Sequence, residues 1–197
     1  IAAHEGAKCS KGVWLDAGSN RIVTVGFTKQ SGREMRVWDL RDTSKKLKKI
    51  DIDQASGVIL PFYDPDTRML YLAGKGDGNI RYYEVDDDKP YIFPLDEYRS
   101  SVSAKGAFML PKRACNVMGC EVARILKLTT NTVEPLHFNV PRKSETFQDD
   151  IFPDSATGAP GNEADAWFGG ETKACPTGSM NPSAAGGAAG GAGGAGA

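Results

Sequence analysis

The sequence is poor in the residues on which catalytic and metal sites depend. It contains two histidines and four cysteines among 197 residues. One Cys-x4-Cys pair with two distant partners matches neither the usual zinc-ribbon spacing nor a dense disulfide framework, and neither histidine stands at ligand spacing. We therefore expect reduced structural thiols and no metal or other cofactor. The six residues are His4, His137, Cys9, Cys115, Cys120 and Cys175.

The sequence also lacks an excess of charge of one sign and a long apolar run. It has 24 basic and 25 acidic side chains, whereas nucleic-acid binders usually carry a basic surplus, so we expect no nucleic-acid partner. No run of about 18 apolar residues is present, so we expect no membrane span. The N-terminus shows neither an initiating Met nor a secretory signal, and we expect the chain to start inside a larger protein.

The C-terminal part has little that could be buried. Residues 177–197 are mostly Ala and Gly, and ordering them would cost entropy without hydrophobic return, so we expect a disordered Gly/Ala-rich linker. Residues 141–176 are rich in Pro, Gly and acidic side chains, which predicts an irregular extension. Trp167 and Phe168 are the residues expected to anchor it.

The first 140 residues have a different pattern, in which short β-rich runs alternate with turn formers. Val, Ile, Tyr, Phe and Trp dominate the runs, as a half-buried pleated surface prefers, and long helical periodicity is absent. The turn signals are Asp16–Ser19, Asp64–Thr67 and Gly76–Gly78. This region is predicted to be all-β. The runs are Arg21–Phe27, Met35–Leu40, Val58–Tyr63, Met69–Ala73, Ile80–Val85 and Val122–Leu128.

Three of these runs align as a repeat. Arg36–Leu40 precedes Arg81–Val85 by 45 residues, and Arg124–Leu128 follows 43 residues later. A four-stranded propeller blade takes roughly 40–45 residues and often carries a Trp-Asp pair at the end of its third strand. The first copy has that pair at residues 38–39, the second has a weakened version at 83–84, and the third has lost it.

The repeat predicts the roles of its positions. Trp38 and Tyr83 should pack between neighbouring blades, while Asp39 and Glu84 help to hold the adjacent turns. His4–Gly6 resembles the Gly-His start of such a repeat. Because a propeller needs about four to eight blades, three do not close a ring. The predicted fold class is therefore all-β, a WD-repeat β-propeller of which residues 1–140 form about three blades.

Longer motifs resemble one family of WD-repeat proteins. Ser56–Thr67 and Leu72–Val85 resemble coronin sequences, and so does Met109–Arg113. Val140–Pro153 is similar to the extension that follows the last blade in coronins, and Ala166–Gly170 falls where that extension has an acidic-Trp-hydrophobic-Gly segment. These matches cover residues 4 to about 170.

The resemblance implies a non-enzymatic, cytoplasmic protein of the cell cortex and actin cytoskeleton. Residues 1–140 would be the last three blades of a seven-bladed ring, and 141–176 the coronin-like extension that packs on it. The expected partner is filamentous actin, with an effect on actin organisation. Regulation of the branched-actin nucleating complex and homo-oligomerisation would depend on early blades and a coiled coil that this sequence lacks.

Two basic clusters are candidate actin contacts. Lys45, Lys46, Lys48 and Lys49 form the densest one, directly after the Trp-Asp strand. They either meet an acidic filament surface or protect an outer strand from edge-to-edge pairing. The second pair is Arg142–Lys143, which either tethers the extension to the propeller or contacts a partner.

Other motifs are interpreted as structural. Gly74–Gly78 is flanked by strands and fits no phosphate-binding loop, so we expect a β-hairpin whose Asp77–Gly78 dipeptide takes positive φ. Asp86–Asp88 does not alternate ligands as a calcium loop does and is expected to be a solvated turn. No catalytic triad is supported. A generic WD-repeat adaptor for peptides or another protein complex remains the alternative, which the coronin-like segment 141–153 disfavours.

Overall fold

The computed structural model describes residues 3–15, 20–143 and 146–184. The chain forms two compact units, which we treat separately. The sheet unit comprises residues 1–110 and 123–137, and the extension unit comprises residues 111–122 and 138–197, each as far as it is described. The predicted turn at Asp16–Ser19 lies outside the described residues.

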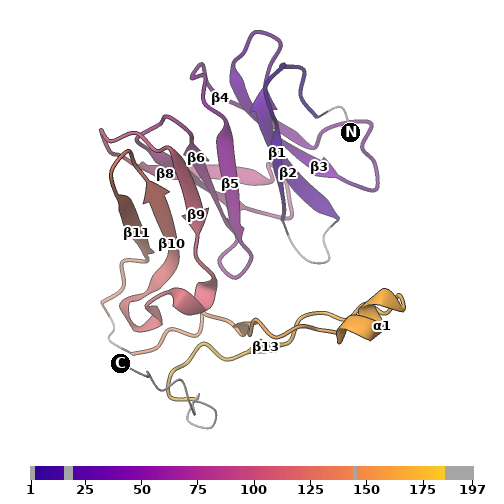
Figure 1. Ribbon diagram of the computed structural model, residues 1–197, viewed down its shortest axis with the longest axis vertical. Coiled ribbons are helices and arrows are strands. Elements are labelled where there is room, and N and C mark those ends of the chain that lie inside the picture. The colour runs from indigo at the N-terminus through magenta and orange to yellow at the C-terminus, as the bar shows by residue number, and fades with distance from the viewer. Residues whose placement is uncertain (1–2, 16–19, 144–145, 185–197) are drawn as a thin grey trace, which may run out of the picture. The chain divides into compact units, whose positions relative to one another are not determined.

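The sheet unit contains three antiparallel sheets in chain order (Figure 1). The first is β1 (Lys11–Trp14), β2 (Arg21–Phe27), β3 (Arg33–Asp39) and β4 (Lys48–Asp53). The second is β5 (Ile59–Asp64), β6 (Met69–Gly74), β7 (Ile80–Val85) and β8 (Ile92–Tyr98). The third has the order β11-β10-β9, with β9 at Gly106–Met109, β10 at Glu121–Leu128 and β11 at Val133–Asn139.

The hydrophobic core lies between the first and second sheets. Alternation along each strand places Val23, Val25 and Val37 on the face toward Leu70 and Leu72, and all five are almost fully buried. Full burial of a Val or Leu side chain stabilises a fold by about 1.5–3 kcal/mol. This packing fixes the orientation of β3, so that one face of the strand lies toward the second sheet and the other face points away from it.

The first strands of the three sheets are neighbours. β1 contacts β5, and β5 contacts β9, so each sheet presents its first strand to the same side of the unit. Figure 1 shows these three strands side by side, with the later strands of each sheet fanning outward. This is the arrangement of successive propeller blades, and the three described sheets do not close into a ring.

The third copy of the sequence repeat was assigned to the wrong strand. Residues Arg124–Leu128 lie in β10, which pairs with β9 on one side and with β11 on the other, so they belong to a second strand rather than a third. The connection from β9 to β10 spans residues 110–120, whereas the one from β5 to β6 spans only 65–68. This insertion moves β10 along the sequence to where a third strand was expected.

The insertion is part of the extension unit. It forms two 3₁₀ turns, η1 (Lys112–Ala114) and η2 (Val117–Gly119). The C-terminal part adds β12 (Ser155–Ala156), which pairs with β13 (Thr177–Gly178), and the short helix α1 (Ala164–Phe168). The expected boundary at residue 141 therefore omitted residues 111–122, which lie earlier in the chain. A small apolar core consists of Val117, Val122, Phe152 and Met180.

Two expectations about this extension are corrected. The linker does not begin at residue 177, because residues 177–178 form a strand and the Met180 side chain joins the core; residues beyond 184 lie outside the described part. Within the extension unit Trp167 and Phe168 are not buried anchors either, since they are 58% and 86% exposed. The buried anchor is Phe152, which is 2% exposed.

Candidate binding surface and its charged neighbours

The lysine cluster lies in the β3–β4 connection and at the start of β4, the last strand of the first sheet. Lys45 and Lys46 are exposed, and the Lys45 ammonium stands 3.9 Å from the Asp42 carboxylate. Within the described chain Lys46 forms no ion pair. Lys48 is half-buried beside Val37. Two of the four lysines are thus available to a partner on geometric grounds.

Lys49 forms ion pairs with carboxylates of its own sheet. Its ammonium lies 2.7 Å from the Asp51 carboxylate and 3.3 Å from Glu34, whose side chain is fully buried. Arg36 reaches the same Glu34 carboxylate at 2.7 Å. Burial raises the pKa of Glu34, but the hydrogen bond from His4 and the charge of Arg36 outweigh it and lower that pKa overall.

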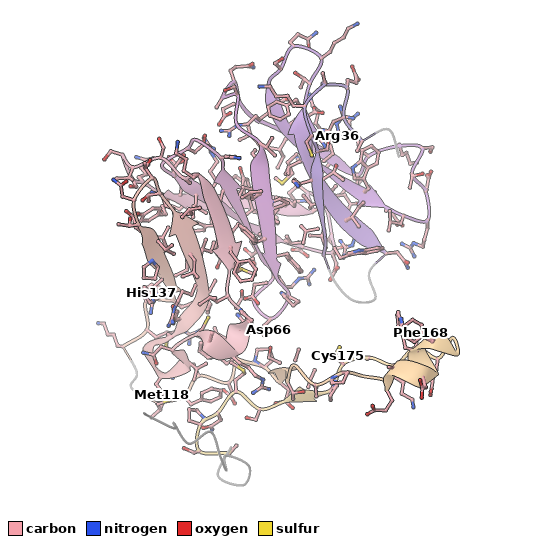
Figure 2. All side chains as sticks on the ribbon, viewed as in Figure 1. Arg36, Asp66, Met118, His137, Phe168 and Cys175 are labelled. Atoms are coloured by element: carbon pink, nitrogen blue, oxygen red, sulfur yellow. The ribbon has the colours of Figure 1, made fainter. Side chains whose placement is uncertain are left out.

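The expected histidine of the repeat is part of a buried network. His4 contacts Glu34 at 2.8 Å through Nδ1 and the Thr24 hydroxyl at 3.0 Å through Nε2. The Trp38 indole donates to the same hydroxyl at 2.8 Å. Arg36, labelled in Figure 2, lies on this same face of the first sheet, the face that points away from the second sheet. Sequence reasoning singled out His4 and Trp38 but missed Thr24 and Glu34, which link them.

The other repeat positions have distinct surroundings. Tyr83 is buried in the core between the first and second sheets. Trp38 occupies the equivalent face of the first sheet, where the described chain supplies no further sheet. Asp39 accepts hydrogen bonds from the Arg41 backbone and guanidinium, and these lower its pKa to about 2. Glu84 is exposed.

A second charged network crosses from the first sheet to the second and was not anticipated. Arg33 is 2% exposed and donates to Asp53 through Nε and Nη2, both at 2.6 Å. The same Nη2 donates to Asp77 at 2.7 Å. Arg81 then reaches Asp53 at 3.0 Å. These residues lie on β3, β4, the β6–β7 turn and β7, so the network joins two sheets through charge-assisted hydrogen bonds.

This network makes stability depend on pH. Burial raises the pKa of Asp53, but hydrogen bonds from Arg33 and from the Ala55 amide lower it overall. Because the folded pKa lies below the unfolded value of about 3.9, the stabilisation is present above that pH and is lost as the pH falls through the folded pKa. We expect the free energy of unfolding, measured in denaturant between pH 6 and pH 2.5, to fall below about pH 4. The Asp53→Asn variant should show a shallower fall, and an identical slope in both proteins would contradict this assignment.

Arg142 and Lys143 do not form a joint site. Within the extension unit, Arg142 donates to the Asp150 carboxylate at 2.5 Å and to Gln148 at 3.4 Å. Arg142 thus links two parts of the extension unit to each other. Lys143 is exposed and remains available to a partner.

The motifs interpreted as structural have particular partners. Residues 74–78 lie in the hairpin between β6 and β7, as predicted, but positive φ falls at Gly76 rather than Gly78. The Asp77 side chain in this turn is held by Arg33. Within the acidic run, Asp87 is bound by Arg21 and Arg68 rather than merely solvated.

The described residues include no group of three or more His, Cys, Asp or Glu side chains placed to hold a metal ion. None of the four cysteines forms a disulfide in the described chain. In the described part, helices are too short and too polar to cross a bilayer.

Comparisons with known proteins agree with this architecture. A family model for a type of WD40 repeat matches residues 133–175. Coronin-A of Dictyostelium discoideum is 48% identical over 170 residues, covering 86% of this chain and 38% of that protein. Human Coronin-2A is 43% identical over 171 residues, covering 86% of this chain and 32% of that protein. The WD40 domain of Toxoplasma gondii coronin superposes with a TM-score of 0.85 at 37% identity, covering 92% of this chain and 47% of that domain.

The three sheets, with their Trp-Asp strand and neighbouring first strands, are part of a WD-repeat β-propeller, which confirms the predicted fold class. The chain belongs to the coronin family. It spans about a third of the length of the curated relatives and about half of the solved coronin propeller.

Proposed function

We propose that this chain contributes to a non-catalytic scaffold that binds actin filaments and organises the actin cytoskeleton. The observation that carries the proposal is membership of the coronin family, at 48% identity over most of the chain. Actin binding is the property for which that family is known. A place in the cytoplasm and at the cell cortex follows from the same proposal.

The β3–β4 connection is the surface that we propose meets the filament. Residues 41–49 contain five basic side chains and one acidic side chain. Arg41, Lys45 and Lys46 are exposed. A local surplus of positive charge speeds encounter with an acidic surface and makes binding sensitive to salt. Lys49, which is paired with Asp51 and Glu34, has a smaller share in this surface than the sequence alone suggested.

Two charge reversals test this surface. We expect Lys45→Glu/Lys46→Glu to lower the affinity for filamentous actin about tenfold or more at low salt, because two attractive charges become repulsive. The measurement is co-sedimentation with filamentous actin, in the longest available protein that contains this chain, across low and high salt. A spin without actin corrects for aggregation.

A matched control reverses the same number of exposed lysines elsewhere. Lys29 and Lys75 lie in the β2–β3 and β6–β7 turns, at the strand ends opposite the β3–β4 connection. Lys29→Glu/Lys75→Glu should bind as the unmodified protein does. If the unmodified protein binds filaments and neither variant differs from it in affinity, the contact lies elsewhere, and Lys143 is the next candidate. If the parent does not bind under any condition, the proposed function is wrong.

The remaining proposals concern the longer protein. Regulation of the branched-actin nucleating complex and homo-oligomerisation through a coiled coil are properties that we propose for the whole protein, since this chain spans 38% of Coronin-A. Packing of residues 141–176 on the propeller is proposed on the same basis. The exposed Trp167 and Phe168, the latter labelled in Figure 2 at the tip of its hairpin, are available for such packing.

A further inference from the structure

Ser44 lies in the exposed β3–β4 connection, three residues after an arginine. Its side chain is exposed, and the Arg41 side chain is 72% exposed. Protein kinases choose substrates partly by charge pattern. Those that favour basic substrates present acidic side chains to an arginine near the acceptor hydroxyl. Both the hydroxyl and the arginine that such a kinase needs are on the surface here.

The sequence offers one other residue with the same spacing. Only Thr24 and Ser44 among the serines and threonines have an arginine three positions earlier. Thr24 is 8% exposed, and its hydroxyl is bound by Trp38 and His4. A kinase could not reach it without unfolding the first sheet. Thr24 and Ser44 have the same spacing from an arginine in the sequence, but in the structure Thr24 is buried and Ser44 is accessible.

We propose that Ser44 is a phosphorylation site for a protein kinase that selects arginine, and that the phosphate weakens binding of the β3–β4 connection to acidic surfaces. The part of this proposal that concerns filaments rests on the proposed function. The part that concerns the site itself does not.

The reaction draws on ATP as the phosphoryl donor. The Ser44 Oγ attacks the γ-phosphorus, so that a new Oγ–P bond forms. The bond from that phosphorus to the β,γ-bridging oxygen breaks, ADP leaves, and the hydroxyl proton passes to the base of the kinase. No redox step is involved.

The phosphate changes the charge of the connection. It adds about −1.5 to −2 at neutral pH, which removes roughly half of the positive surplus of residues 41–49. Lys45, Lys46 and Arg36 border the same hollow as Ser44, of about 460 Å³, so these cations can pair with the phosphate instead of with a partner. Arg36 is 9% exposed, and in the described chain its Nε has no hydrogen-bond partner.

The modification also disturbs the turn itself. The Ser44 Oγ donates to the Asp42 carboxylate at 2.5 Å, and the Ser44 amide donates to the same oxygen at 3.1 Å. Phosphorylation removes the hydroxyl donor and places a second anion beside Asp42. We infer that the turn opens locally while the phosphate is attracted toward Lys45 and Lys46.

The first experiment maps the site. The full chain is incubated with Mg-ATP and the catalytic subunit of an arginine-selective serine kinase, and phosphate is located by tandem mass spectrometry. We expect phosphate on Ser44 and none on Thr24. Arg41→Ala should slow incorporation about tenfold or more, because it removes the recognition charge, whereas Thr43→Ala should leave it unchanged. Phosphate at other positions but not on Ser44 overturns the proposal.

The second experiment measures binding of the phosphorylated and unmodified protein. Retention on immobilised polyglutamate tests the basic surface without actin, and filament co-sedimentation tests the proposed partner. Phosphorylation should reduce both affinities about tenfold at low salt, and Ser44→Ala protein treated with the kinase should be unaffected. If polyglutamate retention is unchanged by phosphate on Ser44, the switch is wrong. Phosphate-sensitive retention on polyglutamate by a protein that never binds filaments supports the switch and refutes the proposed function.

Discussion

Replacement of Arg33 by alanine is expected to destabilise the sheet unit by about 3–5 kcal/mol, the cost of removing one partner from a buried charge network. The Arg33 side chain is 1% exposed, and the Asp53 and Asp77 carboxylates that it binds are 25% and 13% exposed. Without the guanidinium, two partly buried carboxylates lose their main counter-charge. The free energy of unfolding from denaturant titration is the measurement.

Two controls separate the network from a general effect of losing an arginine. Arg41→Ala removes an arginine that is also held by a carboxylate but is 72% exposed, and it should change stability little. Adding Asp77→Asn to Arg33→Ala should recover part of the loss, because one of the orphaned charges is removed. Equal effects of Arg33→Ala and Arg41→Ala would contradict the assigned role of this network.

Replacement of Arg113 by alanine is expected to release the β12–β13 ribbon from the insertion. Its guanidinium donates to the carbonyl groups of Ser155 and Ala156 at 2.9 Å and to that of Gly178 at 2.7 Å. A longer bond of 3.3 Å reaches the Ser179 carbonyl. Bonds from a charged donor contribute about 1.5–3 kcal/mol each, and less where water competes as it does here. We expect backbone hydrogen exchange across residues 153–180 to accelerate by about thirtyfold, a local loss of about 2 kcal/mol.

Hydrogen exchange with mass spectrometry resolves this effect from global unfolding. Arg113→Lys keeps the charge but cannot fork between two strands, so it should give an intermediate rate. Lys173→Ala is the matched control, because among the described residues the ammonium of this exposed lysine pairs only with the nearby Glu171, at 2.7 Å. Unchanged exchange in Arg113→Ala would show that the ribbon is held by its apolar core alone.

Strands with buried, alternating side chains could be predicted from the sequence. The expected runs at 21–27 and 80–85 coincide with β2 and β7, and that at 69–73 ends one residue before β6 does. The outer strand β8 was missed, because most of its side chains are exposed and its pattern carries little periodic signal. The third copy of the repeat was placed on the wrong strand of its sheet for a different reason. An insertion displaced β10, and spacing alone cannot distinguish a moved second strand from a third.

The charged clusters show what spacing cannot reveal. The four lysines form one run in sequence, yet Lys49 turns to Glu34 and Asp51 while Lys45 and Lys46 face solvent. Alternation along β4 predicts that the Lys48 and Lys49 side chains point to opposite faces of the sheet. It does not predict that a buried carboxylate, that of Glu34, lies on one of these faces. The Arg33 network was invisible because its partners are separated by 20 and 44 residues and meet only when two sheets pack.

The place of the insertion in the chain has a consequence for synthesis. Residues 111–122 leave the ribosome before β11, yet Val117 and Val122 pack against Phe152 and Met180, and Arg113 binds carbonyl groups from residue 155 onward. This segment therefore emerges long before the groups that cover it. Until Met180 has been synthesised, the side chains of Val117 and Val122 remain exposed to water, and the Arg113 guanidinium lacks its carbonyl acceptors. A ribosome that stopped after His137 would release the insertion with its apolar side chains uncovered, a marker that quality-control chaperones are built to recognise.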